Sequence, residues 1–214
     1  MKSFVKVFGI VLVLALLVPV IGSAQDKEQN EGNVVSDAKK LAGEAKITLA
    51  AALDKALKAA PGIALKAELE QEENALIFTF DILPKLTSQE ITEIHVNAKT
   101  GAVMKSNEEE EEDEEGEEGE KGEKAEGGEA AEGAAEPTIA DMQAMAKAAK
   151  VTMAVALQTA LKAAPGTVIV VELENEDDAL IFSFDILPSP DATELKEIHV
   201  DAKTGAVIKT EIEK

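Results

Sequence analysis

The stretch ALKAAPGTVIVVELE, residues 160–174, changes its hydrophobic period halfway along and so decides the fold. Upstream of its Pro-Gly pair, apolar side chains recur at helical spacing from Met153 to Ala164, on one stripe of a helix. Pro165-Gly166 stops that helix. Downstream, apolar Ile169, Val171 and Leu173 alternate with Val170, Glu172 and Glu174, as in a strand with one buried face. The stretch therefore predicts a helix followed directly by a strand.

Three more strands are expected after this one. The period of two returns around Phe182 and Phe184, again around Ile198 and Val200, and in a last short run at 206–209. Short connections favour antiparallel pairing, so the unit is expected to be α+β, an N-terminal helix packed on a small four-stranded antiparallel sheet. The segments SDAKKLAGEAK and TIADMQAMAKAAK, which precede the helix in each copy, also look helical, either as separate helices or as bent extensions.

The whole unit is written twice. Residues 47–105 align without a gap with residues 151–209, and about 36 of the 59 positions are identical. Solenoid repeats are shorter and stack without spacers, whereas these copies are separated by a long dissimilar segment. We therefore predict two duplicated domains, 33–107 and 137–214, which fold independently of each other.

The N-terminal segment has the pattern of a secretory signal. Lys2 and Lys6 precede the apolar run Val7–Ile21, and Gly22-Ser23-Ala24 supplies small residues for cleavage. Residues 1–24 are therefore predicted to be a signal peptide, and the alternative is an uncleaved anchor. We expect an exported, periplasmic or extracellular protein with no membrane association after cleavage.

Composition excludes several classes of function. The chain has no cysteine, tryptophan or tyrosine, its 21 basic residues are all lysine, and its net charge is −21. Disulfides, cysteine-ligated metals and a thiol nucleophile are thus excluded. A strongly negative chain with no basic patch is not expected to bind nucleic acid.

The acidic charge is concentrated in residues 108–136, which carry 16 acids and two lysines. This segment has no apolar periodicity, so we predict a disordered linker that keeps two similar sheets apart. It lacks the ligand spacing of an EF-hand loop, and only weak, diffuse binding of divalent cations is expected from it.

The phrase EIHVDAKTGAV, Glu197–Val207, repeats EIHVNAKTGAV at 93–103. Asp201 or Asn97 is expected to begin a turn, and Gly205 or Gly101 to close it with a positive φ; these are turn residues of a hairpin. The list of possible metal ligands on one strand face is Glu197, His199 and Asp201. The outer two lie roughly 13 Å apart, so they cannot share one ion. A two-point site of His and Asp completed by other strands stays open, against the expectation of ordinary surface histidines, His95 and His199. No catalytic, cofactor-binding or metal-binding residue is assigned, because neither histidine is accompanied by a nucleophile elbow or a His-Glu-x-x-His helix.

Each copy resembles the PepSY domain family. The residues that carry the resemblance are ALKAAPGTVIVVELE, a helix-to-strand passage, and LKEIHVDAKTGAVIK, similar to the closing strand pair of the family. The loops LPKLTSQEIT and LPSPDATELK depart from the short glycine turn usual before the third strand. The resemblance implies an α+β fold, no catalytic residues, and a role in restraining or regulating secreted peptidases or cell-wall enzymes.

The sequence is compatible with two functions. The first is a non-catalytic tandem module, without a cofactor, that binds a protein such as a peptidase or cell-envelope enzyme through its exposed sheet face or an edge strand. The alternative is an extracytoplasmic protein that binds divalent cations through its acidic linker.

Overall fold

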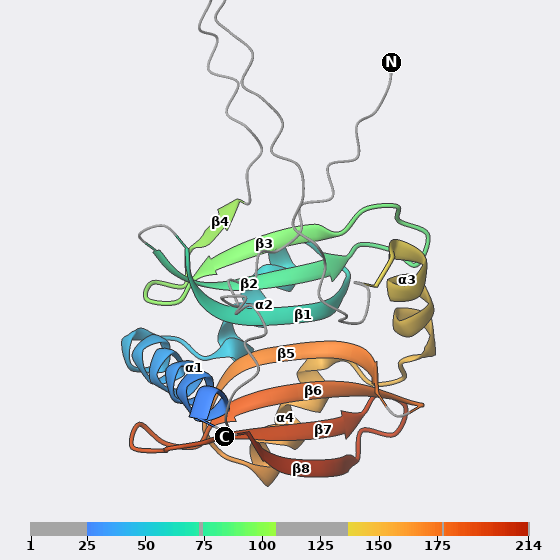
Figure 1. The fold of residues 1–214 in the computed structure, drawn as a ribbon. Coiled ribbons are helices and arrows are strands. Elements are labelled where there is room, and N and C mark those ends of the chain that lie inside the picture. Colours follow the sequence, from blue (N-terminus) through green and yellow to red (C-terminus); the bar gives the residue numbers. More distant parts are fainter. Residues whose placement is uncertain (1–24, 73–74, 106–136, 177, 214) are drawn as a thin grey trace, which may run out of the picture.

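The computed structural model describes residues 25–72, 75–105, 137–176 and 178–213. The predicted signal peptide, 1–24, and the whole of the predicted acidic linker, 108–136, lie outside these residues. The described elements confirm the α+β class, since each copy contributes helices and four antiparallel strands (Figure 1). In the first copy these are α1 (Gln25–Glu44), α2 (Leu49–Ala59), β1 (Ile63–Glu72), β2 (Ala75–Leu83), β3 (Thr92–Asn97) and β4 (Val103–Lys105). In the second they are α3 (Ile139–Ala148), α4 (Met153–Ala163), β5 (Thr167–Glu176), β6 (Ala179–Leu187), β7 (Leu195–Asp201) and β8 (Val207–Glu213).

The helices begin where the sequence predicts. Thr48 Oγ1 accepts a hydrogen bond from the Ala51 amide at 3.2 Å and caps α2. Thr138 and Asp141 form a reciprocal capping box at the start of α3. The question of separate or bent helices is resolved: the chain leaves α1 before α2 begins, and the amides of Lys46 and Ile47 donate to the Ala98 carbonyl. None of the helices in the described residues is long and apolar enough to cross a membrane.

The apolar faces of helix and sheet pack as expected. The stripe of α2 is buried, and so is the matching stripe of α4. These helices cover the sheet face that carries the fully buried phenylalanines Phe78, Phe80, Phe182 and Phe184. The glycine turns also hold, since Gly101 and Gly205 have φ of 72° and 74°.

The two copies do not form two separate sheets. All eight strands make one sheet in the order β4-β3-β2-β1-β5-β6-β7-β8, because β1 pairs antiparallel with β5. Buried side chains of both copies belong to one hydrophobic core. The expectation that the linker keeps the sheets apart is wrong: edge strands β1 and β5 satisfy each other's backbone groups instead of facing water.

The junction between the copies, which we call the seam, is symmetric. Ala67 lies opposite Val171, the equivalent position 104 residues later, and Lys66 lies opposite Glu172. Antiparallel pairing of a position with its own equivalent places a pseudo-two-fold axis there, as in an isologous dimer interface.

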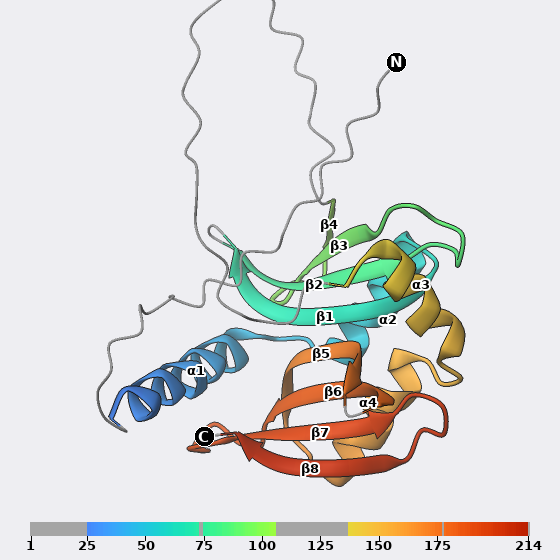
Figure 2. The same cartoon turned by 45° about the vertical axis from the view of Figure 1, so that its right-hand side comes forward.

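Helices α1 and α3 brace the seam from its two ends. α1 contacts β1 of its own copy and β5 and β6 of the other, and α3 contacts both β5 and β1. They stand at opposite ends of the strands (Figures 1 and 2). Gln143 in α3 donates a hydrogen bond of 2.6 Å to the Ser88 carbonyl in the loop between β2 and β3. Each leading helix therefore ties its copy to the other.

Candidate functional site

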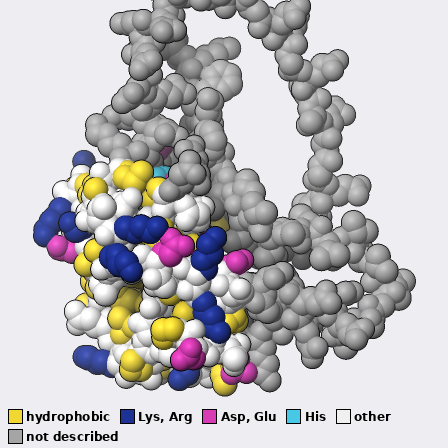
Figure 3. All heavy atoms as spheres, turned by 90° about the vertical axis from the view of Figure 1, so that its left-hand side faces the viewer, with side chains coloured by type: hydrophobic (Ala, Val, Ile, Leu, Met, Phe, Trp, Pro, Cys, Tyr) yellow, Lys and Arg dark blue, Asp and Glu magenta, His cyan; other side chains and the backbone are white. Residues whose placement is uncertain are grey.

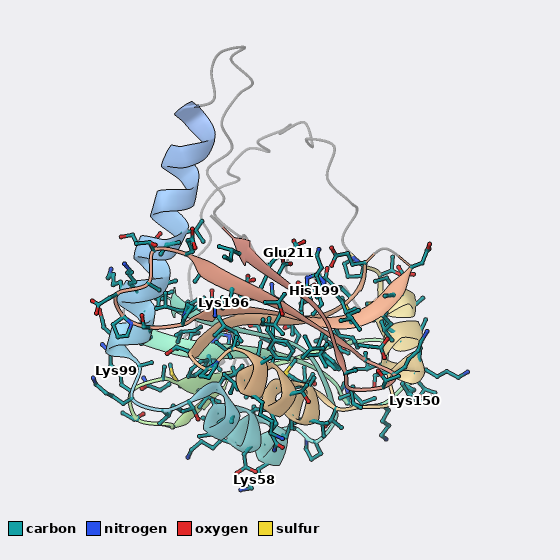
Figure 4. The ribbon with its side chains drawn as sticks, turned by 90° about the horizontal axis from the view of Figure 1, so that it is seen from below. Lys58, Lys99, Lys150, Lys196, His199 and Glu211 are labelled. Atoms are coloured by element: carbon teal, nitrogen blue, oxygen red, sulfur yellow. The ribbon has the colours of Figure 1, made fainter. Side chains whose placement is uncertain are left out.

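The sheet face opposite α2 and α4 carries many charged side chains, and we call it the acidic face; Figure 4 labels two of its residues, His199 and Glu211. The strand registers and the period-two alternation within each strand place these residues on it. For example, Lys66 lies opposite both Asp81 and Glu172. The carboxylates far outnumber the two lysines. The members are Lys66, Glu68, Glu70, Glu72, Asp81, Glu93 and His95 in the first copy, and Glu172, Glu174, Glu176, Asp185, Glu197, His199, Lys209 and Glu211 in the second.

His199 occupies the centre of a charged cluster in the second copy. Its Nε2 lies 2.8 Å from Glu197 Oε1, and its Nδ1 lies 3.0 Å from Glu176 Oε2. Lys209 Nζ reaches Glu176 Oε1 at 3.2 Å. The His199 residue is only 2% exposed, so the expectation of a surface histidine is wrong. The strand periodicity placed it on the correct face, but the flanking side chains of that face bury it.

The first copy repeats this cluster at His95. Its Nε2 lies 2.8 Å from Glu93 Oε1 and its Nδ1 lies 3.2 Å from Glu72 Oε2. The hydrogen bond with Glu93 raises the pKa of His95; partial burial opposes the rise, and the charges of Glu93, Glu72 and Glu70 add to it. A histidine held between two glutamates is thus a property of the repeat.

Both nitrogens of each ring face carboxylate oxygens. At His95, whose pKa is raised, the imidazolium form donates to both Glu93 and Glu72. The candidate ligand atoms of Glu176, Glu197 and His199 all lie within 4.8 Å of one another. However, the two glutamates face different ring nitrogens.

Acid–base catalysis with a hydroxyl nucleophile does not fit these clusters. Ser183 lies opposite His199 across β6 and β7, and Thr79 occupies the same place beside His95. Both ring nitrogens already face glutamates, so neither is free to accept a hydroxyl proton. Thr79 Oγ1 donates to Glu70 Oε1 at 2.5 Å instead.

Near the seam the carboxylates are crowded and partly dehydrated. Burial, together with the charges of Glu93, Glu172 and Glu68, raises the pKa of Asp81 to about 6, although Lys66 opposes the rise. Burial also raises the pKa of Glu68, against the attraction of Lys66, whose Nζ lies 3.4 Å from Glu68 Oε2. Holding these groups ionised at neutral pH costs free energy that a bound positive charge would recover.

The remaining predicted ligand, Asp201, is not part of the cluster. Its Oδ1 accepts from the amides of Lys203 and Thr204 at 3.0 and 2.6 Å, which closes the predicted turn. These hydrogen bonds, first those with Thr204, hold the pKa of Asp201 below its usual value. The open His/Asp pairing is therefore wrong, because the carboxylates beside His199 are glutamates.

Sequence reasoning missed Glu72 and Glu176. They close the clusters from the ends of β1 and β5, more than 20 residues before the histidines. In both copies a glutamate stands at the same distance before the histidine, and this repeated spacing is the only feature of the sequence that could have indicated the contact.

Charge is distributed unevenly around the molecule. The side that lies to the left in Figure 1 shows lysine side chains spread widely, with fewer carboxylates among them (Figure 3). The acidic face is therefore a local feature of the sheet, and the folded part is not uniformly negative.

The chain was compared with known families and with known proteins, and a family model matches both copies. The family model described as PepSY, peptidase propeptide and YPEB domain, matches residues 46–107 and 150–211. A crystal structure of a putative lipoprotein from Clostridium difficile 630 is 20% identical, with a TM-score of 0.39, and the match covers 79% of this chain and 95% of that one. No curated protein matches the chain.

Proposed function

The chain belongs to the PepSY family, and on that premise we propose that it is a non-catalytic, extracytoplasmic module that binds a basic surface of another protein through its acidic face. PepSY domains are generally non-catalytic and propeptide-like. The observation that carries the proposal is that pairing of β1 with β5 merges the polar faces of both copies into one surface.

Electrostatics favours a positively charged partner. The carboxylates of the acidic face lie on rigid strands, so binding does not have to order them. Burial and like charges raise the pKa of Asp81 and of Glu68, and the positive charge of a partner's lysine or arginine would favour their ionised forms. Charge complementarity of this kind also accelerates encounter and makes binding sensitive to salt.

The class of partner follows from the family. Its description names peptidase propeptides, so the proposed partner is an exported peptidase or a cell-envelope enzyme, which this chain restrains from outside. The predicted signal peptide, residues 1–24, is consistent with that location.

The test is affinity capture from the exported protein fraction of the source cells with paired variants. Glu68→Gln with Glu172→Gln removes two charges from the acidic face beside the seam. Asp37→Asn with Asp54→Asn is the matched control, because it removes two exposed charges from α1 and α2. We expect a partner that the control retains, that the face variant loses, and that a chelator leaves bound.

The alternative is cation binding, which the proximity of Glu176, Glu197 and His199 keeps in view. It predicts a different result in the same experiment: capture would require a divalent ion and would disappear with the chelator. A partner retained equally by both paired variants would show that the acidic face is not the binding surface.

A further inference from the structure

The last strand, β8, forms one edge of the described sheet and has an exposed apolar side. No described strand pairs with its outer edge, while β7 pairs with its inner edge. Ile208 is 52% exposed and Ile212 is 55% exposed. A free strand edge with aliphatic side chains is a template for adding another strand.

The sequence of β8 is complementary to itself. Ile208-Lys209-Thr210-Glu211-Ile212 has the same order of chemical types in either direction, apart from the sign of the charges. If two copies pair antiparallel about Thr210, each Lys209 lies opposite the other copy's Glu211, and each Ile208 lies opposite an Ile212. Opposite charges and aliphatic side chains facing each other across strands are stabilising pairs.

The chain already uses this pattern at the seam. There the first copy contributes Leu65-Lys66-Ala67-Glu68-Leu69, which is again aliphatic, lysine, small residue, glutamate, aliphatic. Ala67 is the pairing centre, and Lys66 lies opposite Glu172, the equivalent of Glu68. The β8 segment thus repeats the arrangement that joins two strand edges within this chain.

We propose that β8 is a self-association edge, on which a second copy of this chain adds its own β8 antiparallel about Thr210. The two sheets then become one sheet across a true two-fold axis. Lys209 Nζ, which lies 3.2 Å from Glu211 Oε2 of its own chain, gains the opposite glutamate as well, so four charges form a closed network. The exposed isoleucines of both copies cover each other.

The other edge of the sheet does not have this pattern. β4 has only three residues, Val103–Lys105, and the chain continues as Ser106-Asn107 where β8 has threonine and glutamate. Without an acid two residues after the lysine, two β4 edges would bring no opposite charges together. Association through β8 therefore ends at a dimer.

Charge exchange within one strand tests the proposal. Sedimentation equilibrium is measured on the chain expressed from Met1 in an exporting host, from about 1 to 100 μM. Lys209→Glu alone sets glutamate opposite glutamate, and Glu211→Lys alone sets lysine opposite lysine, twice in each dimer. We expect either single variant to raise the dimer dissociation constant by about tenfold or more, since each favourable cross-strand pair becomes a repulsive one. The double variant restores opposite charges and should return the constant to within about threefold of the unmodified chain.

Two further variants separate association from folding. Ile208→Lys changes a side chain that is already half exposed, so melting should hardly change while the dimer is lost. Met104→Lys, the equivalent change on β4, should leave the dimer intact. A chain that stays monomeric over this range overturns the proposal. So does a folded double variant that remains as weak as the single ones, or a dimer that Ile208→Lys does not affect.

Discussion

Ala67 and Val171 face each other across the seam, although they are the same position of two repeats. The surrounding segment, 63–67 in the first copy, differs from the second at every position, whereas most of the repeat is identical. The symmetry of the seam would allow two lysine–glutamate pairs, but only Lys66 opposite Glu172 is present. At the other position Glu68 lies opposite Val170, which stands where the second copy would need a lysine. The copies have diverged where they touch each other.

We predict that the isolated first copy, residues 33–107, associates with itself. Without the second copy its β1 edge is free, and pairing about Ala67 sets Lys66 opposite Glu68 of another fragment on both sides of the axis. The isolated second copy, 137–214, sets Val170 opposite Glu172 and should dimerise more weakly. Sedimentation of both fragments measures this. Two well-folded monomers would instead support the independent units predicted from the sequence.

The features that could be predicted from the sequence are those set by residues close together along the chain, such as helix caps and turns. Thr48 identifies its helix start, and Gly205 its turn, because caps and turns are local. The pairing of β1 with β5 could not be predicted, because the residue pattern of an edge strand is the same whether water or another strand lies beside it. Periodicity placed His199 on the correct face of the sheet, but it does not predict how deeply a side chain is buried. The burial of His199 depends on Glu176, two strands away.

We predict that His199→Ala lowers the free energy of unfolding by about 1–3 kcal/mol, because Glu176 and Glu197 lose the buried ring nitrogens that they face. Chemical denaturation at pH 6 measures it. His95→Ala is the comparison and should cost less, because the His95 side chain is 12% exposed and that of Glu72 is 52% exposed. Equal and negligible costs would show that neither cluster is stabilising.

Stability should fall as pH rises from about 4 to 8. Asp81 has a folded pKa of about 6, above the usual 3.8, so the native state binds its proton more tightly than the unfolded state. That contribution is complete below the unfolded pKa and is lost as pH rises through 6. The raised pKa of His95 acts in the same direction above 6.5. Melting temperatures across this range measure the slope, and a profile that rises toward pH 8 contradicts it.

We predict that Asp81→Asn flattens the profile between pH 4 and 6 and stabilises the chain at pH 7.5 by roughly 1–2 kcal/mol, because it removes a carboxylate that burial and Glu93 make costly to ionise. Asp37→Asn is the control, since Asp37 is exposed on α1 and should leave the slope unchanged. A variant that is less stable than the parent at pH 7.5 would mean that Asp81 is stabilising as an anion.

We predict that Gly205→Val costs about 1–3 kcal/mol, because a β-branched residue resists a positive φ. A Cβ there would also lie 3.2 Å from Val151 Cγ1. Gly43→Ala in α1 should have the opposite sign, since it meets nothing within 4 Å and alanine favours a helix. Thermal melts of the two variants provide the comparison, and an unchanged Gly205→Val would exclude strain at the turn.

The seam also changes how the acidic face responds to dilution. A surface assembled from two separate chains comes apart when its concentration falls below the dissociation constant, as happens to a protein released into a large volume. Here both halves belong to one polypeptide, so the local concentration of β5 around β1 is set by the connection between them and not by how much protein is made. A single molecule therefore carries the complete two-copy surface at any abundance.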